Sequence, residues 1–175
     1  MTSPRAYLSL PADWALRPMT DEDLFEGVVD LVIRDDDRRR GCLVVLACQT
    51  NGRLMEALPL EGLHPFVDAA GSGSVVTKRV GAILEALRAI AVAGVVLVLA
   101  RPGRPVATAG DRQVLAQLEA LCAPPRPALL GVALATPEGV ATLPRSPGTQ
   151  PAAAGGRDGD NRDEPGTPPA TRRAS

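Results

Sequence analysis

Residues 74–99 read SVVTKRVGAILEALRAIAVAGVVLVL, and this stretch decides the fold class. Its first apolar residues recur every three or four positions, which places them on one face of a helix: Val76, Val80, Ile83, Leu84, Leu87 and Ile90. The spacing predicts a helix from about Ser74, its expected N-cap, to Val92. After Gly94 the pattern changes to a continuous apolar run from Val95 to Leu99, which predicts a strand buried on both faces.

The chain before this stretch predicts one helix and a hairpin. Thr20 and Asp23 resemble a capping box with Asp in place of Glu, and they predict a helix from about Asp21 to Ile33. Two apolar runs on either side of a strong turn signal predict adjacent antiparallel strands; the runs and the turn are Leu43–Cys48, Leu54–Leu58 and Asn51-Gly52.

The chain after this stretch predicts a further helix and two strands. The helix carries apolar residues at helical spacing and ends at Pro124-Pro125; these residues are Val114, Leu115, Leu118, Leu121 and Cys122. The expected strands are Ala128–Ala135 and Val140–Leu143. The order α-ββ-α-β-α-ββ predicts an α/β fold with a single mixed β-sheet flanked by helices.

The length of 175 residues suits one hydrophobic core. We expect a single domain over residues 20–143, preceded by an N-terminal extension over 1–19. From Pro144 to Ser175 the chain is rich in Pro, Gly, Ala, Asp, Arg and Thr and nearly devoid of large apolar residues. Burial could not offset the entropy of ordering such a segment, so we expect a disordered C-terminal tail over 144–175.

Composition argues against several classes of partner. A formal net charge of -1 gives no basic field for phosphate backbones, so nucleic acid is not an expected partner. No apolar stretch approaches the roughly 20 residues that cross a bilayer, and no membrane association is expected. The 3 cysteines lie within apolar runs and are expected to be reduced thiols in a cytoplasmic protein.

Several short motifs between Leu43 and Leu143 resemble those of one family. The run Leu43–Cys48 with Asn51-Gly52 is similar to a strand and hairpin of the JAB/MPN metalloprotease-like domain, in its bacterial RadC-type branch. The segment from Arg101 to Pro105, followed by Thr108-Ala109-Gly110-Asp111, falls where that family carries His-x-His-Pro-Ser-Gly and then Ser-x-x-Asp. The resemblance implies the cytidine-deaminase-like layering of helices on a mixed sheet.

The same resemblance implies a site that lacks the family's zinc ligands. Leu99 and Arg101 stand at the two histidine positions, Pro102 follows them, and Thr108 and Asp111 keep the Ser/Thr-x-x-Asp frame. An active member needs two imidazoles and a carboxylate to hold zinc, and neither Leu nor Arg is a zinc ligand. We therefore expect a pseudoenzyme with no catalytic residue, no metal and no cofactor, which acts as a binding or scaffold domain for a protein partner.

Two other functions stay open at this point. A small-molecule or nucleotide sensor would bind an anion at the Gly71–Ser74 loop, with Ser72, Gly73, Ser74 and Arg79 as ligands and Arg101 as a possible addition. A hydrolase with an unrecognised site would draw on Cys42 or Cys48 and on His64, the single histidine.

Two features have ordinary structural interpretations. Thr108 and Asp111 form a capping pair at the start of the third helix, which we favour as the main role of Asp111. The run Asp35-Asp36-Asp37-Arg38-Arg39-Arg40 abuts opposite charges between a helix and a strand, which predicts a solvated connection.

Overall fold

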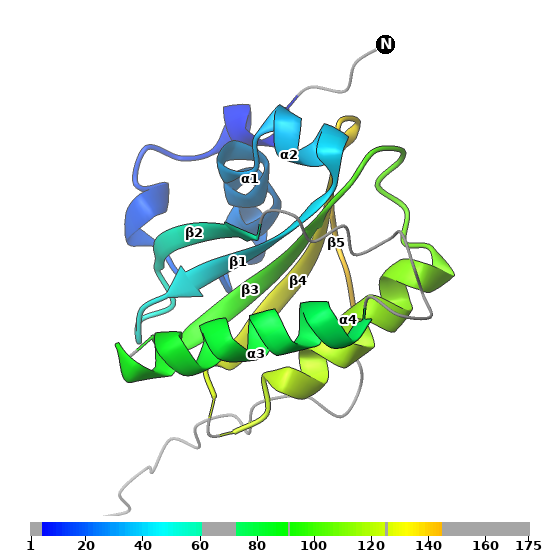
Figure 1. Ribbon diagram of the computed structural model, residues 1–175. Coiled ribbons are helices and arrows are strands. Elements are labelled where there is room, and N and C mark those ends of the chain that lie inside the picture. The colour runs from blue at the N-terminus through cyan, green and yellow to red at the C-terminus, as the bar shows by residue number, and fades with distance from the viewer. Residues whose placement is uncertain (1–4, 61–72, 91, 125, 145–175) are drawn as a thin grey trace, which may run out of the picture.

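The computed structural model describes residues 5–60, 73–90, 92–124 and 126–144. The described chain forms a single five-stranded mixed sheet in the order β2-β1-β3-β4-β5, flanked by helices on both faces (Figure 1). Its elements are η1 (Ala6–Ser9), η2 (Trp14–Leu16), α1 (Glu22–Val32), α2 (Asp35–Arg40), β1 (Cys42–Cys48), β2 (Leu54–Leu60), α3 (Gly73–Ala89), β3 (Gly94–Ala100), α4 (Ala109–Leu121), β4 (Ala128–Thr136) and β5 (Gly139–Thr142). The predicted α/β fold class and the predicted strand order along the chain are confirmed.

The hairpin of β1 and β2 forms at the predicted turn. The two strands pair antiparallel from Leu43 opposite Leu60 to Cys48 opposite Leu54, with an irregularity beside Cys48. Gly52 has a φ of 78°, in the left-handed region that glycine adopts without steric cost. Its carbonyl accepts a hydrogen bond from the Met19 amide at 2.8 Å, which ties this turn to the N-terminal segment.

The centre of the sheet is β3, which is antiparallel to β1 and parallel to β4. Every residue of β1 and of β3 is buried, as expected for strands that are covered on both faces. β4 pairs with the short edge strand β5 from Ala133 opposite Thr142 to Thr136 opposite Gly139. The parallel β3–β4 pair is joined by α4, which makes the crossover that parallel strands require.

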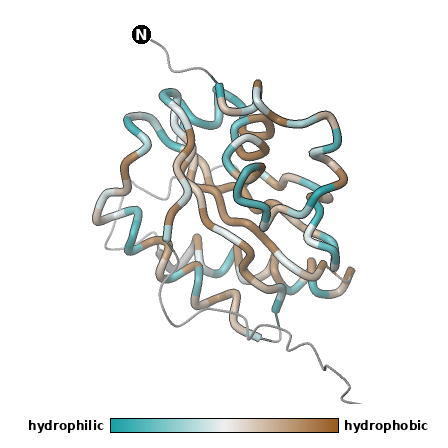
Figure 2. Tube along the Cα trace, turned by 180° about the vertical axis from the view of Figure 1, so that it is seen from behind, coloured by the Kyte–Doolittle hydropathy of each residue, from teal (hydrophilic) through white to brown (hydrophobic). Residues whose placement is uncertain are grey.

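Side chains alternate between two cores, one on each face of the sheet. Leu43, Val45, Leu97 and Leu99 point to the face that α3 and α4 cover, where they meet residues such as Leu84 and Leu118. The neighbouring positions Val44, Leu46, Val96 and Val98 point to the opposite face and pack against α1, through residues such as Phe25 and Val29. Figure 2 shows the strands in brown between helices that alternate brown and teal.

Residues 5–19, expected as an extension, pack against the α1 face of the sheet. Met19 is buried, and Leu10 and Trp14 lie against the same core as Phe25. A β-carbon at Gly27 would come within 2.7 Å of Cδ2 of Leu10, so glycine lets the η1 segment approach α1 closely. Phe25 is buried in this core, and Trp14 is partly buried against it.

The start of α1 differs from the prediction by one residue. Asp21, and not Thr20, is the N-cap, since its side chain accepts a hydrogen bond from the Asp23 amide. Asp is at least as good an N-cap as Thr, and its carboxylate also interacts favourably with the positive end of the helix. The predicted helix is confirmed, and its predicted cap is wrong.

The charged run 35–40, predicted as a solvated connection, is helix α2, and its exposed residues are Asp35, Asp36, Arg39 and Arg40. Asp35, Asp36 and Asp37 occupy its first turn and the three arginines its last turn, which is the arrangement that the helix dipole favours. Gly41, at φ 79°, ends the helix. Arg38 is completely buried, so the prediction failed for the residue that matters most here.

Helix α3 is confirmed with shorter bounds. It begins at Gly73, so Ser74 lies in the first turn and is not the N-cap. It ends at Ala89, and Ile90, expected on its apolar stripe, is 65% exposed. His64 and Ser72 lie outside the described residues, as does the expected tail from residue 145 onward.

Candidate functional site

The residues at the carboxyl end of β3 and the start of α4 form the first candidate site. Arg101 follows directly after β3, and Thr108 is the N-cap of α4. Arg101 and Leu99 are two positions apart on an extended chain, so their side chains start from the same face of the sheet. This is the face that carries α4, and Asp111 in the first turn of that helix meets the guanidinium there.

The Arg101 guanidinium is held by acceptors of its own chain. Nε donates to Oδ1 of Asp111 at 3.1 Å and Nη2 donates to Oδ2 at 2.8 Å, a two-point pairing of guanidinium and carboxylate. Nη1 donates to the Pro102 carbonyl and Nη2 also to the Val106 carbonyl, each at 2.9 Å. Arg101 therefore closes the loop between β3 and α4 around its own side chain.

Asp111 is bound from two further directions. The Thr108 amide donates to Oδ2 at 2.7 Å, and the Asp111 amide donates to Oγ1 of Thr108 at 3.2 Å, which completes a capping box. Burial alone would raise the pKa of the Asp111 carboxyl, but the hydrogen bonds from Arg101 and Thr108 outweigh it and hold the pKa below its ordinary value. The predicted capping pair is confirmed, with an ion pair added to it.

Leu99 is a core residue in the structure. Its exposed fraction is 0%, and it sits in the middle of the sheet between Leu43 and Leu134. Of the positions singled out from the sequence, Arg101, Thr108 and Asp111 come into direct contact, Pro102 contributes its carbonyl, and Leu99 lies in the apolar layer below them.

The expected anion site is only partly within the described residues. Ser72 is outside them, and Gly73 and Ser74 form the first turn of α3. Arg79 is exposed on the same helix. Arg101 directs all three of its guanidinium nitrogens to acceptors within the loop and Asp111, so it is not poised to take up an anion.

No family model, curated protein or solved structure matches the chain. In the described ranges, no group of three or more His, Cys, Asp or Glu side chains is arranged to hold a metal ion. Over the same residues, no helix combines the length and apolar character needed to cross a membrane.

Cys42 and Cys48, considered for a thiol hydrolase, are both buried, as is Cys122, and no disulfide joins the three. Burial raises the pKa of the Cys48 thiol to about 11, and it likewise raises that of Cys122 to about 11. A nucleophilic cysteine needs a lowered pKa and access to substrate, and Cys48 and Cys122 have neither. His64 lies outside the described residues.

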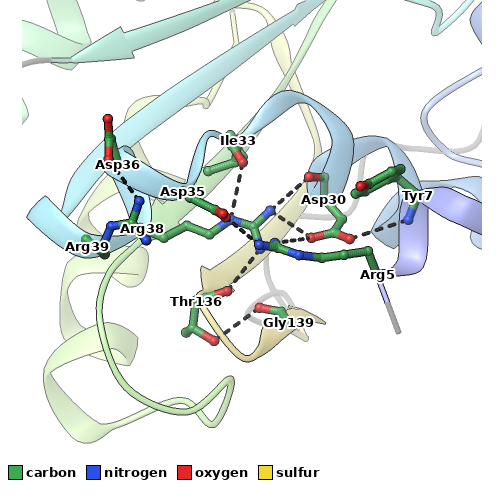
Figure 3. Close-up of polar contacts among 10 residues, drawn as sticks. All are labelled: Arg5, Tyr7, Asp30, Ile33, Asp35, Asp36, Arg38, Arg39, Thr136 and Gly139. Atoms are coloured by element: carbon green, nitrogen blue, oxygen red, sulfur yellow. Dashed lines mark hydrogen bonds and ion pairs between the residues drawn. The ribbon is translucent and has the colours of Figure 1, made fainter. Parts of the chain in front are cut away.

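A buried charged cluster was missed from the sequence. Arg38 lies between α1 and the turn that joins β4 to β5 (Figure 3). Its Nε donates to the Ile33 carbonyl at 3.2 Å, Nη1 to the Thr136 carbonyl at 3.0 Å, and Nη2 to the Asp30 carbonyl at 2.9 Å. Nη2 also lies 2.8 Å from Oδ1 of Asp30, whose side chain is almost completely buried.

The N-terminal segment joins this cluster through Arg5. Its Nη1 pairs with Oδ1 of Asp30 at 3.3 Å, and its Nη2 pairs with the exposed carboxylate of Asp35 (Figure 3). The Tyr7 amide donates to Oδ2 of Asp30 at 3.4 Å. The hydrogen bond with Arg5 holds the pKa of Asp35 below its ordinary value. The cluster links four segments of the chain. Its donors bind acceptors within the cluster, so we interpret it as a structural element that stabilises the fold.

A cavity of about 440 Å³ lies at the other end of β5, beneath the first turn of α1; we call it the β4-edge cavity. Its lining combines apolar side chains with two hydroxyls and one carboxylate: Met19, Thr20, Glu22, Phe25, Leu130, Gly131, Val132, Thr142 and Leu143. No sequence motif marked this place, because its residues come from three separate segments and none belongs to a recognisable catalytic pattern.

Proposed function

We propose that this chain is a non-catalytic binding or scaffold domain of the JAB/MPN type, a pseudoenzyme that acts in the cytoplasm through a protein partner. The observation that carries the proposal is the pairing of Arg101 with Asp111. Where the resemblance implies a zinc ion beside an Asp ligand, this chain holds a permanent cation, and both oxygens of the carboxylate are committed to it. The three cysteines are buried and form no disulfide, which supports a reducing compartment.

The position of Arg101 allows a test in which histidines are introduced to create a zinc site. Histidines at 99 and 101 would stand about 6.6 Å apart along one face of the strand, close enough to share a metal ion with Asp111. The test is the double variant Leu99→His with Arg101→His, prepared beside the native chain and beside a triple variant that also carries Asp111→Asn.

We expect the folded double variant to bind about one zinc ion per chain and the triple variant to bind it much more weakly, because one ligand is lost. Zinc content is read by elemental analysis after gel filtration, and folding by circular dichroism. A folded double variant that gains no zinc would remove the support that the resemblance lends to the proposal. If the double variant fails to fold, Arg101→His alone takes its place, and we expect it to bind zinc more strongly than the native chain does.

A further inference from the structure

The β4-edge cavity has the size of a small-molecule site. Its volume of about 440 Å³ falls within the range of roughly 300–1,000 Å³ that is usual for pockets that bind small ligands. Its lining comes from segments 19–25, 130–132 and 142–143, so the cavity forms only when the chain has folded. Small-molecule sites are mostly apolar, with a few polar groups that orient the ligand. The β4-edge cavity has both parts.

The floor of the cavity is apolar. Phe25, Val132 and Leu143 line the cavity with exposed fractions of only 6%, 1% and 8%, so they form its deepest part. A β-carbon on Gly131 would come within 2.6 Å of Cε2 of Phe25, so the aromatic ring lies directly against the backbone of β4. An aliphatic or aromatic group placed on this floor would lose apolar surface to water, which favours its binding.

The polar groups beside the floor are mainly hydrogen-bond acceptors. Glu22 lines the cavity from the first turn of α1 and is exposed, and its carboxylate makes no hydrogen bond or ion pair with another described residue. The Thr142 hydroxyl donates its proton to Oε1 of Glu26 at 3.1 Å, so it has only lone pairs to offer a ligand. A ligand that donates hydrogen bonds therefore suits these groups better than one that accepts them.

The charges at this end of α1 favour a cation. Among the described residues that line the cavity, Glu22 carries a charge and none is Lys, Arg or His. The nearby Arg17 is paired with Asp21, and Asp23 and Glu26 add negative charge on the first two turns of the helix. A positively charged ligand is complementary to this surface.

The start of α1 is not arranged to bind an anion. A helix N-terminus binds anions through backbone amides that have no other acceptor. Here the Asp23 amide donates to the Asp21 side chain at 3.2 Å, and the amides of Leu24 and Phe25 donate to the Asp21 carbonyl, each at 3.1 Å. These three amides are occupied, so the charge of the ligand is decided by Glu22.

We propose that the β4-edge cavity binds a small organic cation, in which an ammonium group is attached to an aliphatic or aromatic body. The body lies on the floor beside Phe25, and the ammonium group pairs with the carboxylate of Glu22. This site adds a ligand-binding function to the proposed scaffold role, and it does not depend on the residues around Arg101.

The experiment compares three probes of similar shape and different charge: phenethylammonium, phenethyl alcohol and phenylacetate. Each is titrated into ¹⁵N-labelled full-length protein, and the amides of Gly131, Val132 and Leu143 are followed. We expect phenethylammonium to shift these amides saturably with a Kd of about 1 mM, as suits a ligand of this size. The alcohol should bind about tenfold more weakly because it lacks the charge-assisted hydrogen bond, and phenylacetate more weakly still.

Two exposed carboxylates on the same turn provide a matched pair of variants. Glu22→Gln should weaken the binding of phenethylammonium about tenfold and leave that of the alcohol within about twofold of the native value. Asp23→Asn removes a neighbouring charge that is not part of the cavity lining. It should change the affinity for phenethylammonium less than about twofold, because solvent and salt screen exposed charges that do not contact the ligand.

Three results would overturn the inference. The first is the absence of saturable shifts of the cavity amides with phenethylammonium, which would show that the cavity does not accept an amine of this size. The second is equal affinity for the alcohol or for phenylacetate, which would show that the site does not select a cation. The third is an effect of Glu22→Gln no larger than that of Asp23→Asn, which would reduce the binding to general charge attraction.

Discussion

Arg38 and Arg101 are used in the same way on opposite faces of the sheet. Each directs its three nitrogens to different acceptors, two or more of them backbone carbonyls. Each also pairs with a carboxylate whose side chain is 1% or less exposed. Lysine offers its donors from one atom and cannot reach the same spread of acceptors, so these are sites where arginine is required.

Replacing Arg38 by Met should lower the free energy of unfolding by about 3 kcal/mol, because it leaves the buried carboxylate of Asp30 with only the longer contacts to Arg5 and to the Tyr7 amide. Arg38→Lys should recover only part of this loss. Urea denaturation measures both variants. The matched control is Arg39→Met, whose ion pair with Asp36 is on the surface and whose loss should cost no more than about 0.5 kcal/mol. Equal effects of the two Met substitutions would show that the cluster does not fasten the fold.

The lowered pKa of Asp111 predicts how stability depends on pH. A carboxyl with a folded-state pKa below its unfolded value of about 3.9 contributes stability that is complete above that value and is lost as pH falls through the folded pKa. The native chain should therefore exceed Asp111→Asn in unfolding free energy by about 3 kcal/mol at pH 7, and the gap should narrow below about pH 4.

Denaturation at a series of pH values tests this dependence. Asp36→Asn is the matched control, since Asp36 is 67% exposed in its side chain and should give a small difference at every pH. A gap between native and Asp111→Asn that is constant from pH 7 to pH 3 would contradict the ion-pair role of Asp111.

At the scale of elements, sequence patterns predicted those that depend on local periodicity. The stripe of α3, the apolar run of β3, the Asn51-Gly52 turn and the Thr108–Asp111 cap all appear as expected. The prediction for residues 35–40 failed because three acidic residues followed by three basic ones are typical of an exposed segment. The helix dipole favours this order of charges in a helix, and the hydrogen bond to the distant Thr136 carbonyl holds Arg38 in the interior. A contact between residues as far apart in the sequence as Arg38 and Thr136 leaves no pattern in the local sequence.

Two glycines give opposite predictions for the same substitution. Gly131→Ala should destabilise the fold by about 1–3 kcal/mol, because the new β-carbon would overlap the Phe25 ring. Gly81→Ala should stabilise it by about 0.5–1 kcal/mol, since the position lies inside α3 with nothing within 4 Å. Thermal unfolding of both variants measures the difference. A neutral Gly131→Ala would mean that the ring does not lie against β4.

At the scale of the whole molecule, the two faces of the sheet differ in how far apart in sequence their interacting residues are. On the α3–α4 face, the residues of the first candidate site are close in sequence, and the spacing of Thr108 and Asp111 predicted their capping pair. The ion pair of Arg101 with Asp111 was not predicted. On the α1 face, the Arg38 cluster and the β4-edge cavity assemble from distant segments (Figure 3). Neither could be found from the sequence, because their residues meet only after the sheet has formed.

We proposed that Arg101 takes the place of a metal ion in a domain without catalysis. Equilibration of the native, tag-free chain with one equivalent of zinc, followed by gel filtration and elemental analysis, tests this proposal most directly. We expect the zinc to stay with the buffer and the Arg101–Asp111 pair to be undisturbed. About one zinc ion retained per chain, lost on Asp111→Asn, would contradict it and point to a metal-dependent hydrolase.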